Sequence, residues 1–175
     1  MAWKVRKGAL DDASRVAEIN VEGWRGAYRG ILADEYLDAM RPGDRLERIE
    51  LRLTAPPPDT MLLAEDESRF VGAYAGLTAA RDAGDEHPHL PTGEFAALYA
   101  DPAVQGAGAG SSVHQAGVEY LAEQGFKHAV LWVFERNTRS RKFYEARGWE
   151  CDEVVKEGVL GGAAFTEIRY SRGLS

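Results

Sequence analysis

Hydrophobic positions along the chain follow two different spacings. Short runs bounded by polar or turn-forming residues predict strands, and the predicted strands are 3–7, 61–65, 70–79, 94–100 and 128–134. Apolar residues three or four positions apart predict amphipathic helices, and these segments are 11–28, 34–53, 109–124 and 138–147. Strands and helices are mixed along the chain, which predicts an α/β layer structure.

Turn and cap signals set the ends of several elements. Asp11 or Asp12 can cap the first helix. The Pro-Gly pair at 42–43 is expected to interrupt the second helical segment, and Gly148 is a C-terminal cap signal for the last one. The polar, Pro- and Gly-containing stretch 81–93 predicts a loop.

The C-terminal part predicts a final hairpin. Two strand-like stretches, 150–159 and 163–172, flank a Gly-Gly pair at 161–162, and adjacent glycines favour tight hairpin turns. With the strands above, this gives a mixed central sheet of about seven strands flanked by helices. Since no repeat or linker interrupts the order, residues 1–175 are expected to form a single domain.

Composition narrows the class of protein. The 175 residues are 45% hydrophobic and 28% charged, as in ordinary globular domains. The net charge of −7 argues against a general nucleic-acid binder, whose surface is normally basic. Because Cys151 is the sole cysteine, no internal disulfide forms, and we expect a cytoplasmic protein without a signal peptide or a membrane span.

Three glycines lie between a predicted strand and a predicted helix, at positions 106, 108 and 110. Glycine is unfavourable at such a junction unless the backbone bends sharply or must come very close to another group. The first N–H groups of a helix have no intrahelical partner, and the helix dipole favours negative charge there. The spacing therefore predicts a phosphate-binding loop.

Several interpretations of this loop compete. A P-loop needs Gly-Lys-Ser/Thr after its glycines, whereas Ser111 and Ser112 follow here without a lysine. A dinucleotide fingerprint needs G-x-G-x-x-G early in a strand–helix–strand unit, but this sequence has G-x-G-x-G past its midpoint. A tight turn that binds nothing explains a glycine triplet equally well.

Two motifs in the second half of the chain occur in order and at matching spacing. The first is Q-G-A-G-A-G at 105–110, preceded by L-Y-A-D-P at 98–102. The second lies within 133–149, and its matching positions are Asn137, Ser140, Phe143, Tyr144, Gly148 and Trp149. Together they resemble the GNAT superfamily, the acetyl-coenzyme A-dependent N-acetyltransferases. The stretch E-G-W-R-G-A-Y-R-G-I-L at 22–32 also resembles a recurring opening of bacterial members.

Three positions depart from the family pattern. Ala100 replaces the usual Val or Ile at the strand end, and Ser140 replaces Ala. His114 stands where the family often has Leu or Met, and we expect it on the surface of its helix.

The resemblance implies a GNAT fold in which two adjacent parallel strands, 94–100 and 128–134, splay apart and hold acetyl-coenzyme A in the gap. The pantetheine arm would bond to the backbone of the first strand, and the pyrophosphate would rest on the amides of the glycine loop. The implied cofactor-binding residues are Leu98, Tyr99, Ala100, Gln105, Gly106, Ala107, Gly108, Ala109, Gly110, Ser111 and Asn137. Arg139 and Arg141 are candidates for the 3′-phosphate, although a solvated helix face is the favoured interpretation of both.

Acetyl transfer to an amine needs a neutral nucleophile, a donor for the developing oxyanion and a proton for the departing thiolate. The resemblance assigns the last role to Tyr144, whose phenol is protonated at neutral pH. Glu94 opens a strand where some family members carry a glutamate base, and a surface carboxylate is the competing interpretation. Asn137 is expected both to cap its helix and to contact the cofactor arm.

The acceptor side carries fewer signals. Trp24 and Tyr28 lie in the region that walls the acceptor in this fold, but both share the apolar stripe of the first helix, which favours core packing for Trp24. His87 and His89 flank a proline, and two histidines without partners do not make a metal site. No metal is therefore expected.

Two functions stay open at this point. One is an enzyme that moves an acetyl group from acetyl-coenzyme A to a primary amine of a small molecule or peptide by direct attack. The other is a coenzyme A-binding regulatory protein with little or no turnover. Tyr144 and the intact glycine loop favour the enzyme. Nucleic acid and membrane partners are not expected, and a homodimer is left open.

Overall fold

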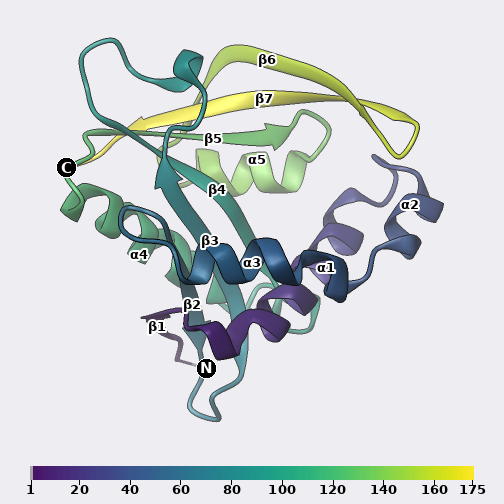
Figure 1. Ribbon diagram of the computed structural model, residues 1–175. Coiled ribbons are helices and arrows are strands. Elements are labelled where there is room, and N and C mark those ends of the chain that lie inside the picture. The colour runs from purple at the N-terminus through teal and green to yellow at the C-terminus, as the bar shows by residue number, and fades with distance from the viewer. Residues whose placement is uncertain (1) are drawn as a thin grey trace.

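The computed structural model describes residues 2–175 and contains one seven-stranded sheet in the order β1-β2-β3-β4-β5-β7-β6 (Figure 1). The strands are β1 (Lys4–Lys7), β2 (Thr60–Glu65), β3 (Val71–Ala79), β4 (Thr92–Ala100), β5 (His128–Phe134), β6 (Glu150–Leu160) and β7 (Ala163–Gly173). β4 and β5 pair in parallel, whereas the other neighbouring strands pair antiparallel. The mixed sheet of seven strands predicted from the sequence is confirmed.

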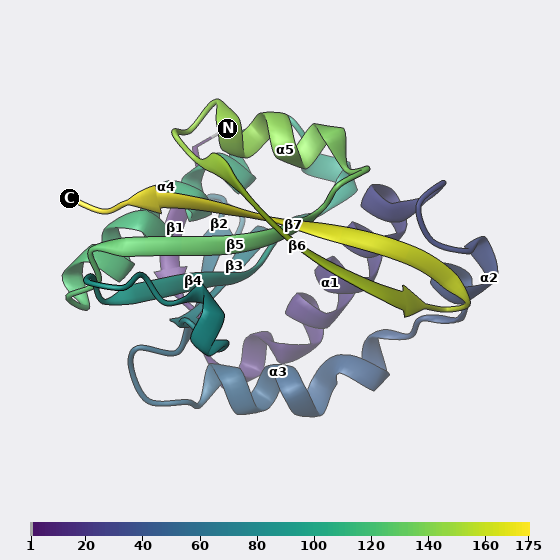
Figure 2. The ribbon, with the colours of Figure 1, turned by 90° about the horizontal axis from the view of Figure 1, so that it is seen from above.

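Helices cover both faces of this sheet. They are α1 (Ala13–Tyr28), α2 (Asp34–Ala39), α3 (Leu46–Leu53), α4 (Ala109–Glu123) and α5 (Thr138–Glu145). Figure 2 shows α1 and α3 on one side of the sheet and α4 and α5 on the other. The sheet therefore has a hydrophobic layer on each face, as expected of a helix–sheet–helix sandwich.

Apolar side chains alternate between these two layers. Leu77 and Leu131 are fully buried beneath Val113 and Leu121 of α4. On the opposite face Leu63 packs with the buried side chains of α1 and α3. Period-two strands and period-3.6 helices each bury one face in this way, which explains why the hydrophobic spacing alone located most elements.

The predicted breaks also occur in the structure. The segment 34–53 divides into α2 and α3, with a short 3₁₀ turn at Pro42–Arg45 between them. The stretch 81–93 is a loop up to Thr92, where β4 begins, with one 3₁₀ turn at Ala83–Asp85. The final hairpin turns at Gly161 and Gly162, both of which have positive φ.

The two parallel strands stay paired over a short distance. Thr92–Phe95 of β4 pairs with His128–Leu131 of β5, and beyond this point the strands part. β4 continues along β3, with Ala96 as an extra residue in a bulge, while β5 continues along β7. The splayed pair that the GNAT resemblance implied is thus present.

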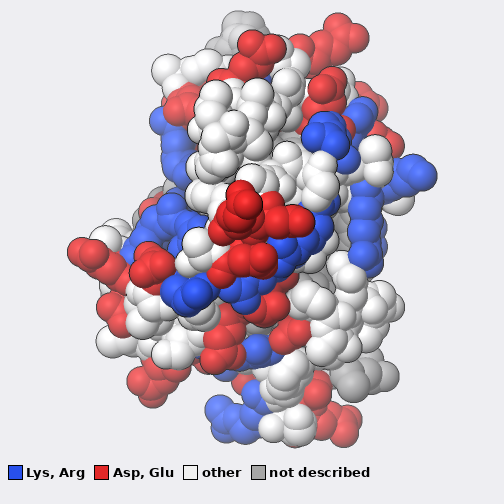
Figure 3. All heavy atoms as spheres, turned by 90° about the vertical axis from the view of Figure 1, so that its right-hand side faces the viewer, with Lys and Arg blue, Asp and Glu red and all other residues white. Residues whose placement is uncertain are grey.

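Charged side chains of both signs are distributed over the molecule. On the face drawn in Figure 3, basic and acidic residues are interleaved rather than gathered by sign. Within residues 2–175, none of the helices is both long and apolar enough to cross a membrane.

Candidate active site

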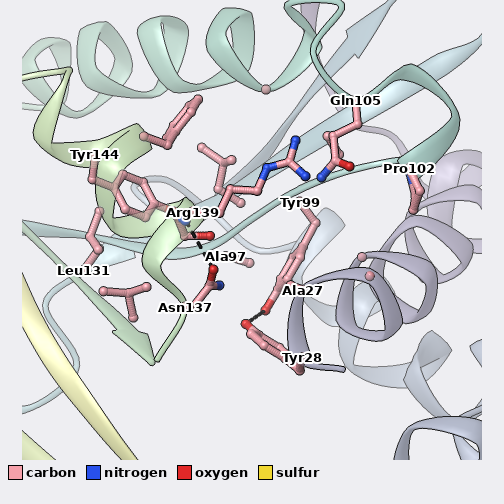
Figure 4. A pocket seen from close by; sticks show the side chains of 18 of the residues that line it. Ala27, Tyr28, Ala97, Tyr99, Pro102, Gln105, Leu131, Asn137, Arg139 and Tyr144 are labelled. Atoms are coloured by element: carbon pink, nitrogen blue, oxygen red, sulfur yellow. Dashed lines mark hydrogen bonds between the residues drawn. The ribbon is translucent and has the colours of Figure 1, made fainter. Parts of the chain in front are cut away.

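A cavity of about 760 Å³ opens where β4 and β5 separate. Its wall is formed by the C-terminal half of α1, the outer half of β4, the glycine loop, β5 and α5. Figure 4 shows Tyr144 and Leu131 on the left of the view and Tyr28 and Tyr99 on the right, with Asn137 and Arg139 between them. Because α1 and α5 lie on opposite faces of the sheet, this cavity connects the two faces.

The glycine loop turns its backbone toward this cavity. Gly106, Gly108 and Gly110 line it, whereas the side chain of Ala109 is buried in the core and Ala107 is not part of the lining. Gly106 has φ +83° and Gly108 has φ +94°, conformations that L side chains rarely adopt. The alternating glycines therefore expose a ribbon of backbone on one side of the loop.

This ribbon leads directly into the start of α4. Gly108 is the N-cap residue, so the amides of the first helical turn have no partner within the helix. Positive helix-dipole potential and free N–H groups coincide at this point, which is the arrangement that binds phosphate groups. The loop can hold an anion without a lysine.

Arg147 adds a full positive charge beside the loop. Its Nη2 donates to Ser111 Oγ at 2.7 Å, and its guanidinium lies 3.6 Å from the centre of the Phe143 ring. Arg147 lines the cavity together with Ser111 and Phe143. The sequence did not single out this arginine because it lies just beyond the end of α5, outside the positions that the motif specifies.

Two arginines within α5 have different surroundings. Arg139 lines the cavity and extends toward Gln105 in Figure 4. Arg141 is not part of the lining: its Nε donates to the Tyr170 hydroxyl at 3.1 Å and its Nη1 donates to the carbonyl oxygen of Glu135 at 3.0 Å. Of the pair, Arg139 alone is therefore positioned to contact an anion in the cavity.

The outer half of β4 offers unpaired backbone along the cavity. Leu98, Tyr99 and Ala100 all line it, beyond the last residue of β4 that pairs with β5. An extended ligand arm can therefore add to this strand edge through main-chain hydrogen bonds, as peptides do in β-augmentation.

Asn137 joins β5 to α5 at the cavity wall. Its Oδ1 accepts a hydrogen bond from the backbone N–H of Ser140 at 3.2 Å, so it is the N-cap of α5, as predicted. The residue is buried and lines the cavity. The cap fixes the start of the helix that carries Tyr144.

Tyr144 occupies the α5 wall of the cavity. Its ring is buried and meets Phe143 and Trp149 edge-on. Burial, with a smaller contribution from Tyr28, raises the pKa of Tyr144 well above its usual value. The phenol is therefore protonated at neutral pH and is available as a proton donor.

His114 is buried, and the expectation of a surface histidine was wrong. Its side of α4 faces α5 and the sheet rather than solvent, and it is 3% exposed. Trp149 Nε1 donates to His114 Nε2 at 2.8 Å, and the His114 ring stacks on Phe95. Burial lowers the pKa of His114 to about 4, so the imidazole is neutral at physiological pH.

Two tyrosines meet on the α1 side of the cavity. The hydroxyls of Tyr28 and Tyr99 share a hydrogen bond of 2.9 Å, and both residues line the cavity (Figure 4). Burial raises the pKa of Tyr28 to about 12, although the bond to Tyr99 opposes this and the charge of Glu167 adds to it. Trp24 packs edge-on against Tyr28 and is not part of the lining, which agrees with core packing for Trp24.

Glu94 does not join the cavity lining. Its carboxylate is buried and accepts hydrogen bonds from Arg81, with Nη2 to Oε1 at 2.5 Å and Nε to Oε2 at 3.1 Å. The backbone N–H of Arg81 also donates to it, at 3.2 Å. The carboxylate is thus already occupied by a partner, and this arrangement gives no support to a base at Glu94.

A second carboxylate lies nearer to the tyrosine pair. Glu167 of β7 is directly opposite Phe134 of β5, whose ring is 4.7 Å from the ring of Tyr28. Glu167 is half-buried and, within residues 2–175, forms no ion pair, because its cross-strand neighbour Lys156 pairs with Asp82 instead. Burial raises the pKa of Glu167, against the opposing charges of Lys156 and Arg81.

His87 and His89, the two histidines that flank Pro88, lie away from the cavity. The rings of His87 and His128 are 4.9 Å apart, and the His89 backbone N–H donates to His87 Nδ1. In the described part of the chain, no three His, Cys, Asp or Glu side chains are grouped closely enough to hold a metal ion.

Known proteins share this sequence and architecture. Residues 22–149 match the model of the acetyltransferase (GNAT) family. The uncharacterized N-acetyltransferase YuaI of Bacillus subtilis is 28% identical over 165 residues, which cover 94% of this chain and 89% of that protein. A mycothiol acetyltransferase of Thermobispora bispora is 30% identical over 136 residues, which cover 74% of this chain and 45% of that protein. The chain therefore spans less than half the length of this mycothiol acetyltransferase.

A solved structure gives the same result for the fold. The PaiA N-acetyltransferase of Thermoplasma acidophilum, solved with coenzyme A, superimposes with a TM-score of 0.76 at 17% identity and covers 99% of both chains. The family model covers most of the chain, including the glycine loop, the splayed strands and α5. This protein belongs to the GNAT family of acetyltransferases.

Proposed function

We propose that this protein transfers an acetyl group from acetyl-coenzyme A to a primary amine of a small molecule or peptide by direct attack. The observation that carries the proposal is the cavity between β4 and β5, which joins an anion-binding loop on one face of the sheet to a tyrosine-lined pocket on the other. Such a cavity allows two substrates to meet from opposite sides without a covalent enzyme intermediate.

The residues present fit coenzyme A along its length. The pyrophosphate would be held by the amides of the glycine loop and by Arg147, with Arg139 near the adenosine end. The pantetheine arm would add to the backbone of Leu98–Ala100, where β4 has no partner on its β5 side. The bound thioester supplies the acetyl group and a thiol leaving group.

The chain then has two tasks at the reacting carbon. A backbone N–H of β4 next to the cavity donates to the oxyanion as the amine attacks, which stabilises the developing charge. Tyr144 donates its phenolic proton to the sulfur as the carbon–sulfur bond breaks. The attacking neutral amine gives up one N–H proton, which replaces the proton lost by Tyr144, so the products are the acetylated amine and free coenzyme A.

An acceptor that arrives as an ammonium must lose a further proton before it can attack, and this step is assigned to the acceptor side. The sequence predicted Glu94 as the base, but its carboxylate is engaged by Arg81. Neither carboxylate is part of the cavity lining, but Glu167 is half-buried, its charge acts on the lining residue Tyr28, and no cation pairs with it within residues 2–175, so it is the better candidate. We propose that Glu167 attracts the acceptor ammonium and accepts its proton through water.

A thiol-release assay tests the proposal. Acetyl-coenzyme A is incubated with panels of simple amines, amino acids, aminoglycosides and peptides, and free thiol is measured. Because two of the similar proteins are mycothiol acetyltransferases, the panel also includes the acceptor substrates of those enzymes. Acceptor-dependent release supports the enzyme, whereas tight coenzyme A binding without turnover on any acceptor supports a regulatory protein.

Cytoplasmic location and a homodimer stay predictions. Analytical ultracentrifugation tests whether the protein is a homodimer.

A further inference from the structure

Trp3 contacts the glycine loop from outside the cavity. Its indole Nε1 donates a hydrogen bond to the carbonyl oxygen of Ala107 at 2.8 Å, across 104 positions of sequence. Trp3 is half-buried, immediately precedes β1 and is not part of the cavity lining. Any influence of Trp3 on a bound ligand must therefore pass through the loop.

The indole occupies a notch between β3 and the turn that precedes the loop. A Cβ atom on Gly72 would lie 2.5 Å from Trp3 Cη2 and 3.0 Å from Val104 Cγ2, so the ring reaches the β3 backbone because position 72 has no side chain. The carbonyl oxygen of Gly72 also accepts the N–H of Asp101 at 2.8 Å. Trp3, β3 and the turn at Asp101–Val104 thus form one packed unit.

The contact at Ala107 determines which way the next peptide points. The N–H of Ala107 donates to the carbonyl oxygen of Val104 at 3.0 Å, and its carbonyl accepts from Trp3. The C=O and N–H of a trans peptide point in opposite directions. With the Ala107 carbonyl held toward Trp3, the N–H of Gly108 in the same peptide points away from Trp3, and Gly108 itself lines the cavity.

Without this contact, the loop has considerable freedom to turn the peptide over. Gly106 and Gly108 flank Ala107, and glycine populates positive and negative φ about equally. A binding site whose donors are already oriented loses less conformational entropy on binding than one that must order itself. An indole anchored in β3 supplies that order.

We propose that Trp3 is a positioning residue for the pyrophosphate of acetyl-coenzyme A: its indole N–H holds the Ala107–Gly108 peptide with the loop amides directed at the ligand. The inference rests on the proposed function, since it concerns the same donor substrate. It assigns a binding role to a residue about a hundred positions before the loop, outside both motifs.

The test compares Trp3→Phe with the unaltered protein on three acyl donors. Phenylalanine keeps an aromatic ring in the notch and removes the N–H. We expect the Kd and KM for acetyl-coenzyme A to rise about three- to tenfold, the effect of one neutral hydrogen bond, with kcat unchanged at saturation. The same loss is expected with acetyl-dephospho-coenzyme A, which keeps the pyrophosphate. With S-acetylpantetheine, which lacks it, the variant and the unaltered protein should have equal KM values.

A second variant separates this role from general folding. Gly72→Ala places a Cβ against the ring, so it should displace the indole and reproduce the Trp3→Phe effect, and the double variant should lose no more than either alone. Gly76→Ala, on the same strand with ordinary space around a Cβ, is the matched control. An equal loss on all three donors, an additive double variant or unchanged Kd values would overturn the proposal. Failure of the unaltered protein to bind acetyl-coenzyme A would instead reject the proposed function.

Discussion

The two ends of the cavity present different groups to a ligand. At the glycine-loop end, the surface is backbone: Gly106, Gly108 and Gly110 line the cavity, with positive φ at the first two and the start of α4 beside them. At the α1 end it is side chain: the hydroxyls of Tyr28 and Tyr99, with Glu167 close by. A backbone surface suits a group that is the same in every turnover, and a side-chain surface can be changed one residue at a time. The comparison predicts that cofactor binding depends on conformation, whereas acceptor choice depends on residue identity.

Tyr144 lies between these two ends, and changing it should have the largest effect. Tyr144→Phe keeps the buried ring and removes the hydroxyl that protonates the departing thiolate. General acid assistance is typically worth about 10²–10⁴ in rate. We expect kcat to fall in this range, with the Kd for acetyl-coenzyme A nearly unchanged, as measured by single-turnover kinetics and calorimetry.

Tyr120→Phe is the matched control for this change. Tyr120 lies on α4, outside the cavity, and its hydroxyl donates to the carbonyl oxygen of Pro58, so removal of this hydroxyl should leave kcat unaffected. If Tyr144→Phe kept the unaltered kcat under conditions where chemistry limits the rate, the acid role would be rejected and the two ends of the cavity would need another connection.

Gly108→Val tests whether the cofactor end acts through backbone conformation. The residue has φ +94°, which a β-branched side chain strongly disfavours, and it lines the cavity. Loss of one or two hydrogen bonds to a charged phosphate, at about 1.5–3 kcal/mol each, corresponds to a roughly 100-fold rise in Kd for acetyl-coenzyme A. Calorimetry measures this directly.

Gly125→Val distinguishes cofactor binding from backbone strain alone. Gly125 has φ +91° with open space around it and lies beyond the end of α4, away from the cavity. It should lose stability to a similar extent but bind acetyl-coenzyme A normally. Comparable Kd values for the two valine variants would contradict a phosphate site at the glycine loop.

The same contrast explains what could be predicted from the sequence. The glycine spacing, the apolar strands and the Asn137 cap are local signals, so the sequence located the two strands, the glycine loop and the start of α5. The splay of β4 and β5 was implied by the resemblance to the GNAT superfamily and not by any spacing. At the acceptor end, Tyr28 and Tyr99 form a hydrogen bond although they lie 71 positions apart in the sequence. No local sequence pattern predicts such a contact. Glu94 and Glu167 are indistinguishable in the sequence, since their partners come from other elements of the fold.

His114 shows why burial on a helix could not be predicted from the sequence alone. Its helix has a broad buried surface, so spacing alone does not show which flank faces solvent. The ring is enclosed by Phe95 of β4, Phe143 of α5 and Trp149, which immediately precedes β6. A polar residue within such a cluster becomes visible once the helix is packed against its neighbours.

His114 also makes the stability of the folded protein sensitive to acid. Its pKa falls from 6.5 to about 4 in the folded protein, so the unfolded chain binds a proton that the folded chain does not. Stability is then fully present above about pH 6.5 and is lost as the pH falls toward 4, by about 3 kcal/mol in total. Denaturant titrations of the protein and of His114→Gln between pH 4 and 7 measure this contribution as the difference between the two curves.

Glutamine is the informative substitution here because its amide oxygen can still accept the indole N–H of Trp149 and it does not titrate. We expect His114→Gln to flatten the stability profile between pH 6.5 and 4, even if it is less stable at pH 7. Parallel profiles for the two proteins would show that another group governs the loss and that His114 is not buried as a neutral imidazole.

Glu167→Gln tests the acceptor end of the cavity and has the smallest expected change in rate. Unlike the other substitutions, it should increase the stability of the folded protein at pH 7. Burial raises the folded-state pKa of Glu167 above 4.5, so the ionised carboxylate is disfavoured in the fold. This penalty is absent below about pH 4.5, where the carboxyl is protonated in both states, and it grows as the pH rises through the folded-state pKa. Glutamine should therefore stabilise the protein at pH 7 and not at pH 4, as shown by thermal unfolding at both values.

The same substitution should reduce activity where the acceptor needs a base. We expect kcat/KM for the amine to fall about tenfold at pH 7, less than for a directly contacting base because the proton passes through water. The deficit should shrink toward pH 10, where free neutral amine becomes abundant. Glu94→Gln is the matched control: it breaks the ion pair with Arg81 and should lower stability without a pH-dependent loss of activity. If instead Glu94→Gln gave the pH-dependent loss and Glu167→Gln gave none, the base would be Glu94, the Arg81 pair would have to open during turnover, and the acceptor would enter along β4 rather than beside Tyr28.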